Sequence, residues 1–304
     1  MPLGFINALD WAYGDGVNDD ANALNLAASE ANADQIGLWL PKGTYDIGTT
    51  VTIPAGIDVI GNGVIRLKSS FSKTAPAVRI GSSGSANLCR NIEIEVDDAG
   101  AVSWSSADSA AVEFINPQSC KIVVRRARGC TTGVLVSADV LAVANEIRVG
   151  LLQDCRYGVR FVGQVRDNLL MSGRWSLAHS QDIERSMWKI DSTSASGNTW
   201  ILPSSDAPRF SSSSSRRLSY LHTVSGFNRT WGLGDDSGID VSNGDAHLVA
   251  DGASAQYNLI QIGRHDSGET PTIVKINSAP SNVNAILRRR DEAANQTVLG
   301  GVVT

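Results

Sequence analysis

The chain has 304 residues, of which 42% are hydrophobic, and a formal net charge of −5 at pH 7. This composition is ordinary for a soluble protein with a continuous core, and the negative charge argues against nucleic acid or an acidic membrane surface as a partner. No long apolar run without charges is present, so the sequence predicts no transmembrane helix. Residues 1–5 lack the basic and apolar segments of a secretory signal peptide.

The first predicted element is a helix that ends near Ala33. Asn18 and Asp19 precede an alanine-rich run, so one of them is expected to cap a helix of about four turns. The acidic residues Asp15, Asp19 and Asp20 lack the spacing and the final Glu of a calcium-binding loop. A structural role is therefore favoured over metal binding, and we predict no metal site and no cofactor.

The middle of the chain repeats itself, because segment 120–136 is followed by a second copy of the same pattern at 145–161. Each copy has a short alternating strand, a polar turn, a Gly and a second alternating strand. Such a repeat buries its apolar face only by stacking on copies of itself, and two short strands per unit indicate coils of a parallel β-helix. Because an open end of the stack would expose strand edges, the helix is predicted to cover it. The predicted inward-facing residues are Ile122, Val124, Val134, Val136, Ile147, Val149, Val159 and Phe161.

Asparagine and cysteine side chains recur with the period of the coils. Cys130 and Cys155 occupy the same turn of successive copies, and Cys120 occupies the position of Asn145. Two disulfides or a metal site are the alternatives, but this regular placement favours reduced thiols stacked in the core. The recurring series, at intervals of 23 to 30 residues, is Asn91, Cys120, Asn145, Asn168 and Asn198, with Asn228 and Asn258 as its expected continuation.

Two insertions between coils are candidate ligand-binding segments, because a solenoid carries its binding surface on loops at one side. Residues 97–109 contain Trp104, and residues 172–186 contain Arg174 and Trp175. A Trp ring covers the apolar face of a sugar, and Arg binds its hydroxyls or an acidic group. We therefore predict Trp175, Arg174 and Trp104 as substrate-binding residues.

The insertion at 172–186 also holds the candidate catalytic residues. Glycoside hydrolysis requires two carboxylates about 5 Å apart for retention, or roughly 6.5 to 9.5 Å apart for inversion. Asp182 with Glu184 is the favoured pair, because Arg174 and a Trp lie in the same segment. A lyase needs a base and a group that neutralises the uronate, which His179 and Arg174 would supply. For any single carboxylate, including those of this pair, a solvated or salt-bridged role is the stronger interpretation; the candidates are Glu93, Glu95, Asp97, Asp98, Glu113, Glu146, Asp154, Asp182, Glu184 and Asp191.

Beyond the serine-rich segment 204–217 the pattern loosens, although short apolar runs between Gly, Asn, Asp and Ser turns continue. We predict a C-terminal β region there that closes the column and promotes trimerisation. The chain is thus expected to form one elongated body: an N-terminal segment with a capping helix (1–35), a parallel β-helix (36–230) and a C-terminal β region (231–304).

A family resemblance is carried by four motifs, in this order: Asp10–Gly16, Asn18–Asp20, Leu40–Tyr45 and Ile60–Gly63. Together they resemble the N-terminal signature of the pectate-lyase-like β-helix proteins found in bacteriophage tailspikes and related polysaccharide enzymes. The resemblance implies an all-β fold, a right-handed parallel β-helix (solenoid), usually a homotrimer, that binds and often cleaves a bacterial surface polysaccharide. The chain departs from the family pattern at Trp11–Ala12 and Ala21. Only nine residues precede Asp10, so we expect no separate particle-binding domain.

The predicted function is that of a spike protein of a bacteriophage, or of a phage-derived particle, that binds a bacterial surface polysaccharide for host adsorption. The expected partners are that polysaccharide, two further copies of the chain, and a phage tail or particle adaptor protein, without nucleic acid or membrane. The expected location is the virion, and outside the cell after host lysis. Two alternatives remain open: a dedicated polysaccharide hydrolase or lyase, and a structural fibre or adaptor subunit without glycan activity. Cleavage of the glycan by the spike itself is also left open.

Overall fold

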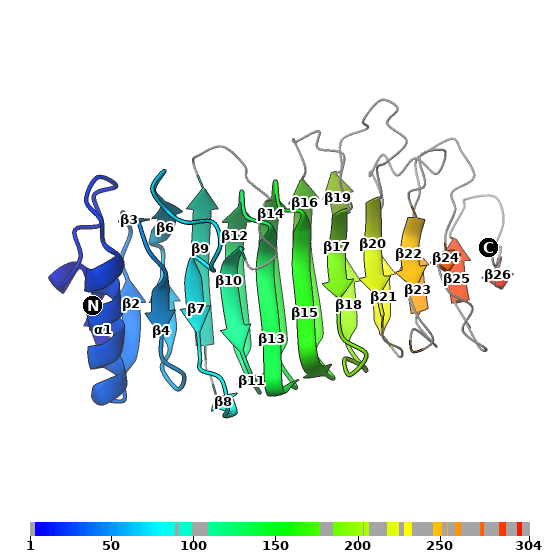
Figure 1. Ribbon diagram of the computed structural model, residues 1–304, viewed down its shortest axis with the longest axis horizontal. Coiled ribbons are helices and arrows are strands. Elements are labelled where there is room, and N and C mark those ends of the chain that lie inside the picture. The colour runs from blue at the N-terminus through cyan, green and yellow to red at the C-terminus, as the bar shows by residue number, and fades with distance from the viewer. Residues whose placement is uncertain are drawn as a thin grey trace.

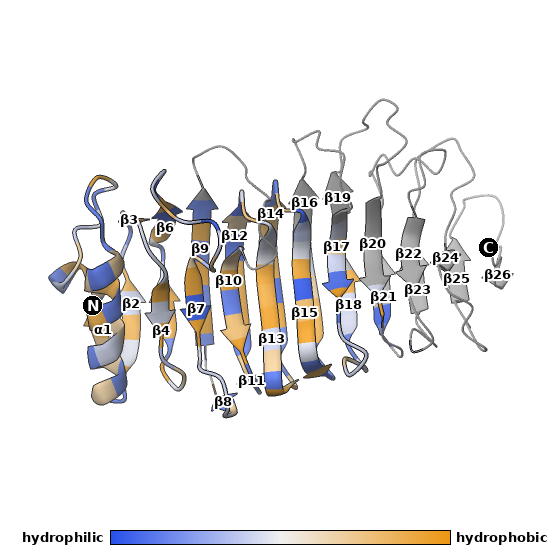
Figure 2. Cartoon of the chain, viewed as in Figure 1, coloured by the Kyte–Doolittle hydropathy of each residue, from blue (hydrophilic) through white to orange (hydrophobic). Residues whose placement is uncertain are grey.

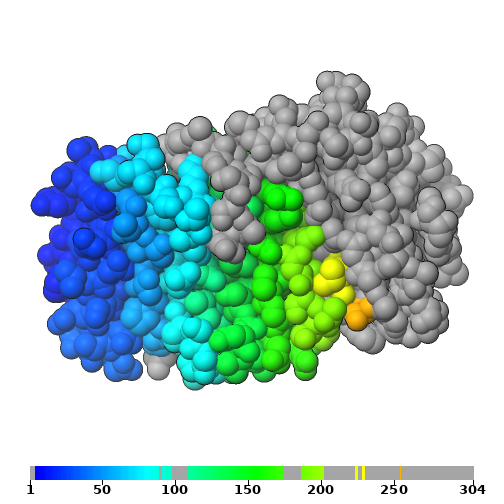
Figure 3. Space-filling model, viewed as in Figure 1, coloured from blue at the N-terminus to red at the C-terminus, as the bar shows by residue number. Residues whose placement is uncertain are grey.

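Consecutive coils of strands stack along one axis in the computed structural model, and an α-helix lies at the N-terminal end (Figure 1). In the space-filling view the coils form successive bands from blue to green along the molecule (Figure 3). The structure describes residues 4–88, 91–98, 109–176 and 185–202 and several short segments beyond them. These segments are 204–206, 218–224, 228–232, 246–250, 254, 259–262, 274–276, 286–289 and 297–299. No helix in this described part is long and apolar enough to cross a membrane.

The strands form two sheets, A and B, and the chain also contains a 3-10 helix, Ala8–Asp10, and helix α1, Ala21–Ala33. Sheet A contains β1 (Phe5–Asn7), β2 (Gly37–Leu40), β3 (Thr44–Ile47), β5 (Val59–Gly61), β6 (Val64–Leu67), β9 (Asn91–Asp98), β12 (Lys121–Arg128), β14 (Glu146–Gln153), β16 (Leu169–Ser176), β18 (Thr199–Leu202), β19 (Ser204–Asp206), β21 (Arg229–Gly232), β23 (Leu259–Ile262), β25 (Ile286–Arg289) and β26 (Thr297–Leu299). Sheet B contains β4 (Val51–Ile53), β7 (Val78–Ile80), β8 (Asn87–Leu88), β10 (Ala110–Ile115), β11 (Pro117–Gln118), β13 (Thr132–Val143), β15 (Tyr157–Arg166), β17 (Arg185–Ile190), β20 (Leu218–Thr223), β22 (Ala246–Ala250) and β24 (Val274–Ile276).

The interior of the column is the one predicted from the repeat, and the parallel β-helix is confirmed. The stacked pairs are Ile122 with Ile147, Val124 with Val149, Val134 with Val159 and Val136 with Phe161. Each of these side chains is at most 2% exposed, and burial of one such side chain stabilises the fold by about 1.5 to 3 kcal/mol. Figure 2 shows the alternation of apolar and polar residues along these strands. The core continues with Trp188 and Trp200, whose rings pack edge to face with centroids 5.3 Å apart.

The corner at which sheet B passes to sheet A is short in two successive coils. β13 is joined to β14, and β15 to β16, by two residues each. The first residue has a left-handed backbone, with φ of 57° at Ala144 and 53° at Asp167. The second residue is Asn145 or Asn168, and both are buried. This corner therefore repeats the same backbone conformation in successive coils.

The buried asparagines form a hydrogen-bonded ladder along that corner. The Nδ2 of Asn145 donates to Oδ1 of Asn168 over 2.7 Å, and Asn168 donates to Oδ1 of Asn198 over 2.9 Å. Asn198 donates in turn to Oδ1 of Asn228 over 3.0 Å, so the predicted series is confirmed from Asn145 to Asn228. Its first member was wrong, because Asn91 is in register with Lys121 rather than with Cys120. Asn258 lies outside the described residues.

The cysteine positions follow the same stacking. Cys120, Cys130 and Cys155 are buried free thiols, as predicted, and Cys89 lies outside the described residues. Burial raises the pKa of the Cys155 thiol to about 12. A thiol with such a pKa stays protonated at neutral pH and behaves as a core residue.

The opposite corner, from sheet A to sheet B, varies in length. Three residues, 129–131, join β12 to β13, and 154–156 join β14 to β15. By contrast, 99–109 connect β9 to β10, and 177–184 connect β16 to β17. Both predicted insertions therefore start and end at this corner.

Helix α1 caps the column at its N-terminal end, as predicted. Leu24 and the alanines of the same face are buried against the first strands. The residue at the N-terminal cap is Asp20, not the predicted Asn18 or Asp19, although Oδ1 of Asp19 accepts a hydrogen bond from the amide of Ala21 over 3.1 Å.

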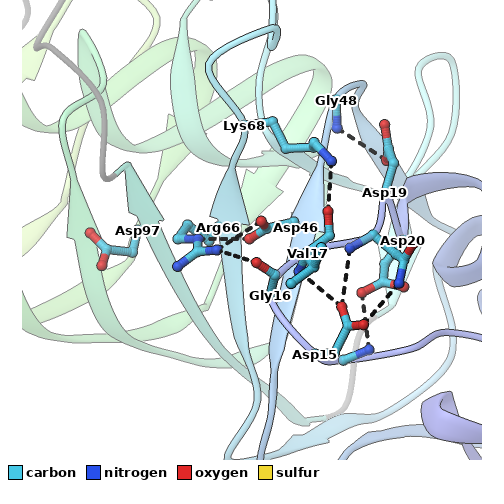
Figure 4. Close-up of polar contacts among 12 residues, drawn as sticks. Asp15, Gly16, Val17, Asp19, Asp20, Asp46, Gly48, Arg66, Lys68 and Asp97 are labelled. Carbon is cyan, nitrogen blue, oxygen red and sulfur yellow. Dashed lines mark hydrogen bonds and ion pairs between the residues drawn. The ribbon is translucent and has the colours of Figure 1, made fainter.

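The acidic residues before this helix hold the turn that leads into it (Figure 4). Asp15 accepts hydrogen bonds from the amides of Val17 and Asn18, and Asp20 accepts one from the amide of Tyr13 over 2.7 Å. The hydrogen bonds from the amides of Asn18 and Val17 lower the pKa of the Asp15 carboxyl. The carboxylates thus have a structural role, as the sequence analysis predicts.

At the other end, parallel pairing continues on both sides of residue 230. β21 pairs with β23 and β20 with β22, whereas β25 and β26 pair antiparallel. The division of the chain at residues 35 and 230, and a trimerisation role for 231–304, stay predictions.

Candidate functional site

Two of the predicted site residues, Arg174 and Trp175, lie in strand β16. The insertion predicted at 172–186 is therefore shorter than expected, because β16 extends to Ser176 and β17 begins at Arg185. The roles of the other predicted residues stay predictions, because the described residues do not include Trp104, His179, Asp182 and Glu184.

Strand register separates Arg174 from Trp175. Trp175 is in register with Leu152, which is fully buried, and Arg174 is in register with Leu151, which is half-buried. The sequence analysis predicted an insertion here, whereas pairing with β14 keeps this segment in sheet A.

The two insertions nevertheless flank one part of sheet B. The chain enters this sheet at β10 after the first insertion and at β17 after the second, and β13 and β15 lie between these strands. Residues at the beginning of the four strands are in register with one another; they are Ala110, Thr132, Tyr157 and Ser186. Both insertions are therefore joined to the edges of one four-stranded surface.

The outer side of these four strands carries a row of side chains with little exposure to solvent. Glu113, Leu135, Arg160 and Lys189 follow one another in register. Only 8% of Glu113 and 9% of Lys189 is exposed. Charged residues are seldom this well buried unless they are paired, so these side chains are expected to have partners.

Tyr157 lies at the centre of a group of cations on this surface. The guanidinium of Arg156 lies 4.8 Å from the centroid of the tyrosine ring, that of Arg160 lies 5.8 Å away, and Nζ of Lys189 lies 5.9 Å away. Each contact is within the range of a cation–π interaction. Three positive charges from two strands and a turn therefore converge on one side chain that is 8% exposed.

Two carboxylates on the same surface are held by ion pairs, as the sequence analysis predicted for them. Glu113 accepts hydrogen bonds from Nε of Arg79 over 2.8 Å and from the hydroxyl of Ser137 over 2.9 Å. Asp191 binds Nε of Arg160 over 2.5 Å and lies 3.6 Å from Nζ of Lys189. These contacts fix the orientation of the carboxylates and of their cations.

Two buried hydroxyl groups lie at the beginning of β13, on Thr132 and on the residue before it. Thr131 and Thr132 are fully buried, and neither Oγ1 has a hydrogen-bond partner among the described residues. Buried polar groups are nearly always hydrogen-bonded to protein, water or ligand. We use the name sheet B polar face for the polar and charged side chains on this side of the four strands and beside them. Its residues are Arg79, Glu113, Thr132, Ser137, Tyr157, Arg160, Lys189 and Asp191.

A second charged surface lies on sheet A and has a structural explanation. Glu93 pairs with Arg125 over 2.9 Å, Glu95 with Arg126 over 2.9 Å, and Asp97 also binds Arg126, over 3.1 Å. These pairs connect β9 to β12 rung by rung. The salt-bridged role predicted for these carboxylates is confirmed.

Arg125 has a further role in this network. It lies at an irregularity in the pairing of β12 with β9, and its guanidinium also contacts the backbone oxygens of Gly61 and Gly63. The motif Ile60–Gly63 is therefore a binding site for an arginine two coils away.

The sheet B polar face combines the groups that bind sugars and their substituents. Its carboxylates accept hydrogen bonds from sugar hydroxyls, and its lysine and arginines donate to hydroxyl or anionic oxygens. Sequence reasoning missed Tyr157, Arg160 and Lys189 as site residues, because it looked for dense chemistry within one insertion. The available signal was their stacking: Glu113, Leu135, Arg160 and Lys189 are separated by roughly one coil each.

Comparisons with known proteins agree with this fold. Residues 5–93 match the model of the family described as rhamnogalacturonase A/epimerase, pectate lyase-like. This match covers the four motifs of the N-terminal signature, and no curated protein matches the chain in sequence. The resemblance to pectate-lyase-like β-helix proteins is confirmed for this first part of the chain.

Solved structures extend the likeness of the fold to nearly the whole chain. The ORF18 protein of Geobacillus virus E2 is similar with a TM-score of 0.58 and 16% identity over 98% of this chain. The match covers 63% of that viral protein. A mutant of the DFA-IIIase of Arthrobacter chlorophenolicus A6, in complex with DFA-III, is similar with a TM-score of 0.50 and 11% identity over 98% of this chain and 91% of that one.

Proposed function

We propose that the chain is a spike protein of a bacteriophage or phage-derived particle, and that it binds a bacterial surface polysaccharide for adsorption to the host. The binding surface is the sheet B polar face together with the two insertions that flank it. The observation that carries the proposal is the convergence of Tyr157, Arg160 and Lys189, with two oriented carboxylates, on the outer side of sheet B.

The chemistry of this surface suits a sugar chain better than a protein partner. Its residues are polar or charged and little exposed, whereas a protein interface has an apolar core. Adjacent coils lie about 4.8 Å apart, which is close to the length of one sugar unit, so successive strands would contact successive units. The viral source of the ORF18 structure, whose fold this chain shares, supports assignment to a phage particle.

Binding to capsular polysaccharide and lipopolysaccharide from candidate hosts tests the proposal. We expect one preparation to bind, and Tyr157→Ala to weaken that binding on the order of tenfold, because it removes the group on which the cations converge. Arg148→Ala is the matched control, since Arg148 is half exposed on sheet A and pairs with Glu146. A broad panel without binding would overturn the proposal and favour a structural fibre or adaptor subunit.

Cleavage is a second candidate function, because the second insertion, which contains the predicted carboxylate pair, joins the proposed binding surface at the start of β17. The same incubations report it through chain length and the absorbance of unsaturated uronate. Shortening without absorbance would mean hydrolysis, for which Asp182 and Glu184 remain the proposed pair. Shortening with absorbance would mean a lyase and would direct attention to His179 and Arg174.

Assembly of the particle is part of the proposal. We propose a homotrimer that is joined to a phage tail or particle by an adaptor protein. Light scattering of the purified chain measures the oligomer number, and a monomer at micromolar concentration would contradict the trimer.

A further inference from the structure

We infer that the N-terminal end of the column is a docking surface for a protein partner that presents basic and apolar side chains. This inference concerns residues before and on α1, and it does not depend on glycan binding. We use the name cap surface for the exposed apolar and acidic side chains of this end. Its residues are Leu9, Asp10, Trp11, Tyr13, Asp15, Val17, Asp19, Leu26, Glu30 and Asp34.

Exposed apolar side chains are concentrated at this end of the molecule. Seven large hydrophobic residues are exposed in the described part of the chain, and five of them belong to the cap surface. Val17 is 71% exposed, Tyr13 68% and Trp11 43%. Leu9 contacts the same loop, because a Cβ added at Gly14 would lie 2.7 Å from its Cδ2. Single exposed apolar residues are ordinary, whereas a group that includes Tyr and Trp is typical of a protein interface.

The loop that carries Tyr13 and Val17 is held in place by hydrogen bonds (Figure 4). Asp20 accepts from the amides of Tyr13 and Gly14 over 2.7 and 3.1 Å. On the other side of the loop, Lys68 donates to the backbone oxygen of Val17 over 2.9 Å. A surface that is already ordered loses less conformational entropy on binding than a flexible loop does. The exposed side chains are therefore presented on a preorganised backbone.

The negative charge of the chain is concentrated at the same end. Residues 1–41 contain six acidic residues and no Lys, Arg or His, whereas residues 42–304 contain 25 acidic and 26 basic residues. Five of the six carboxylates are exposed, and the buried one is Asp20. Arg66 and Lys68 reach this end from the first coils, but they bind Asp46 and backbone oxygens. Among the described residues, no basic side chain forms an ion pair with the five exposed carboxylates.

Charge complementarity selects the partner. A basic surface is attracted to these carboxylates, whereas nucleic acid or an acidic glycan is repelled. A second copy of the chain offers no basic surface at its ends, since residues 231–304 have nine acidic and five basic residues. Along the column, arginines such as Arg125 and Arg160 are already paired with carboxylates. The partner is therefore another protein, whose apolar side chains cover Trp11 and Tyr13 while its lysines or arginines contact the surrounding carboxylates.

Binding of three labelled synthetic peptides to the full chain, measured by fluorescence anisotropy, tests the inference. One peptide alternates lysine with leucine, the second lysine with serine, and the third glutamate with leucine. We expect the first to bind on the order of tenfold more tightly than the second, because it also covers the apolar residues, and the third not to bind. Added salt should weaken binding of both lysine peptides. Absence of binding by the lysine–leucine peptide, or equal binding of the two leucine peptides, would overturn the inference and leave the proposed function intact.

Variants of the apolar residues localise the binding to the cap surface. Trp11→Ser combined with Tyr13→Ser should lower the affinity for the lysine–leucine peptide on the order of tenfold and leave that for the lysine–serine peptide unchanged. Leu88→Ser is the matched control, because Leu88 is 64% exposed on the column. An unchanged melting temperature would show that the double substitution leaves the fold intact. If this variant bound the lysine–leucine peptide as tightly as the natural chain does, the assignment to the cap surface would be wrong.

A second pair of variants tests the charge. Glu30→Gln should weaken binding of both lysine peptides by about threefold, whereas Glu146→Gln on sheet A should leave it unchanged. Equal effects of these two substitutions would contradict a specific role for the cap surface. Light scattering of the variant with Trp11→Ser and Tyr13→Ser should give the same oligomer number as the natural chain. A lower number would mean that the surface joins copies of this chain, and the inference of another protein would fall.

Discussion

Tyr45 shows at the scale of a residue how burial controls ionisation. Its side chain is fully buried, and its hydroxyl donates to the backbone oxygen of Pro41 over 3.1 Å. Burial, and to a lesser extent the charge of Asp20, raises the pKa of Tyr45 from 10.0 to about 12. Because the unfolded chain ionises first, this residue contributes stability below pH 10 that is lost as the pH rises toward 12.

We therefore predict that Tyr45→Phe flattens the alkaline fall in thermal stability. At pH 7 the variant should be about 1 kcal/mol less stable, because it lacks one hydrogen bond. Between pH 10 and 12 its melting temperature should fall less than that of the natural chain. Tyr13→Phe is the control, because Tyr13 is 68% exposed, and an equal change in both variants would contradict the assignment.

A second residue-scale prediction concerns Ala144, at the two-residue corner between β13 and β14. Its φ of 57° lies in the left-handed region, where an L-residue is strained and glycine is not. Ala144→Gly should therefore stabilise the protein by about 0.5 to 1 kcal/mol, measured by denaturant unfolding. Ala27→Gly in α1 should have the opposite sign, by about 1 kcal/mol.

At the scale of the element, the asparagine ladder connects one coil to the next through side chains. Asn168 accepts hydrogen bonds from the amide and the side chain of Asn145, and donates to Asn198 and to the backbone oxygen of Ala142. A backbone turn in this conformation would otherwise leave buried polar groups without partners. The ladder thus fixes the stacking register at the corner between sheets B and A.

Asn168→Ala should therefore destabilise the protein by about 2 to 4 kcal/mol, because it leaves several buried groups without a partner. Denaturant unfolding measures this loss. Asn22→Ala, on the exposed side of α1, is the control and should change stability by less than about 0.5 kcal/mol. A loss below about 1 kcal/mol for Asn168→Ala would mean that water replaces the ladder.

The whole molecule depends on α1 to cover the end of the column. Leu24 is 1% exposed on the covered side of this helix, whereas Leu26 is 57% exposed on the other side. Leu24→Asp should detach the helix and expose the apolar end, which would cause aggregation that light scattering detects. Leu26→Asp should remain as soluble as the natural chain. Equal aggregation of both variants, or of neither, would contradict a capping role.

The repeat made much of this architecture predictable. Period-two alternation and a spacing of one coil were enough to assign Ile122 above Ile147, because the stacking of apolar residues is what stabilises each coil. The pairing irregularity at Arg125 was not predictable, since nothing in one strand shows that its arginine will reach Gly61 and Gly63 two coils away.

The candidate site was predictable only in outline. The positions of the insertions predicted on which side of the column the site lies. The identity of its residues depended on the register in which the strands pair. Tyr157, Arg160 and Lys189 come from two strands and meet only when those strands pair. Trp175 illustrates the reverse case, because pairing assigned a residue expected in a loop to strand β16.

The two kinds of corner differ in what they fix between coils. Where sheet B passes to sheet A, the buried asparagine before the next strand stays in the ladder whether the corner has two residues, as at 144–145, or eight, as at 191–198. That side chain ties this corner to the coils above and below it. The opposite corner accommodates three residues in one coil and eleven in another without disturbing the strands that flank them. New ligand specificities would therefore arise by exchange of whole loops at one edge, while the coils beneath them keep their sequence pattern. In protein engineering, that edge is the place to graft a foreign binding loop.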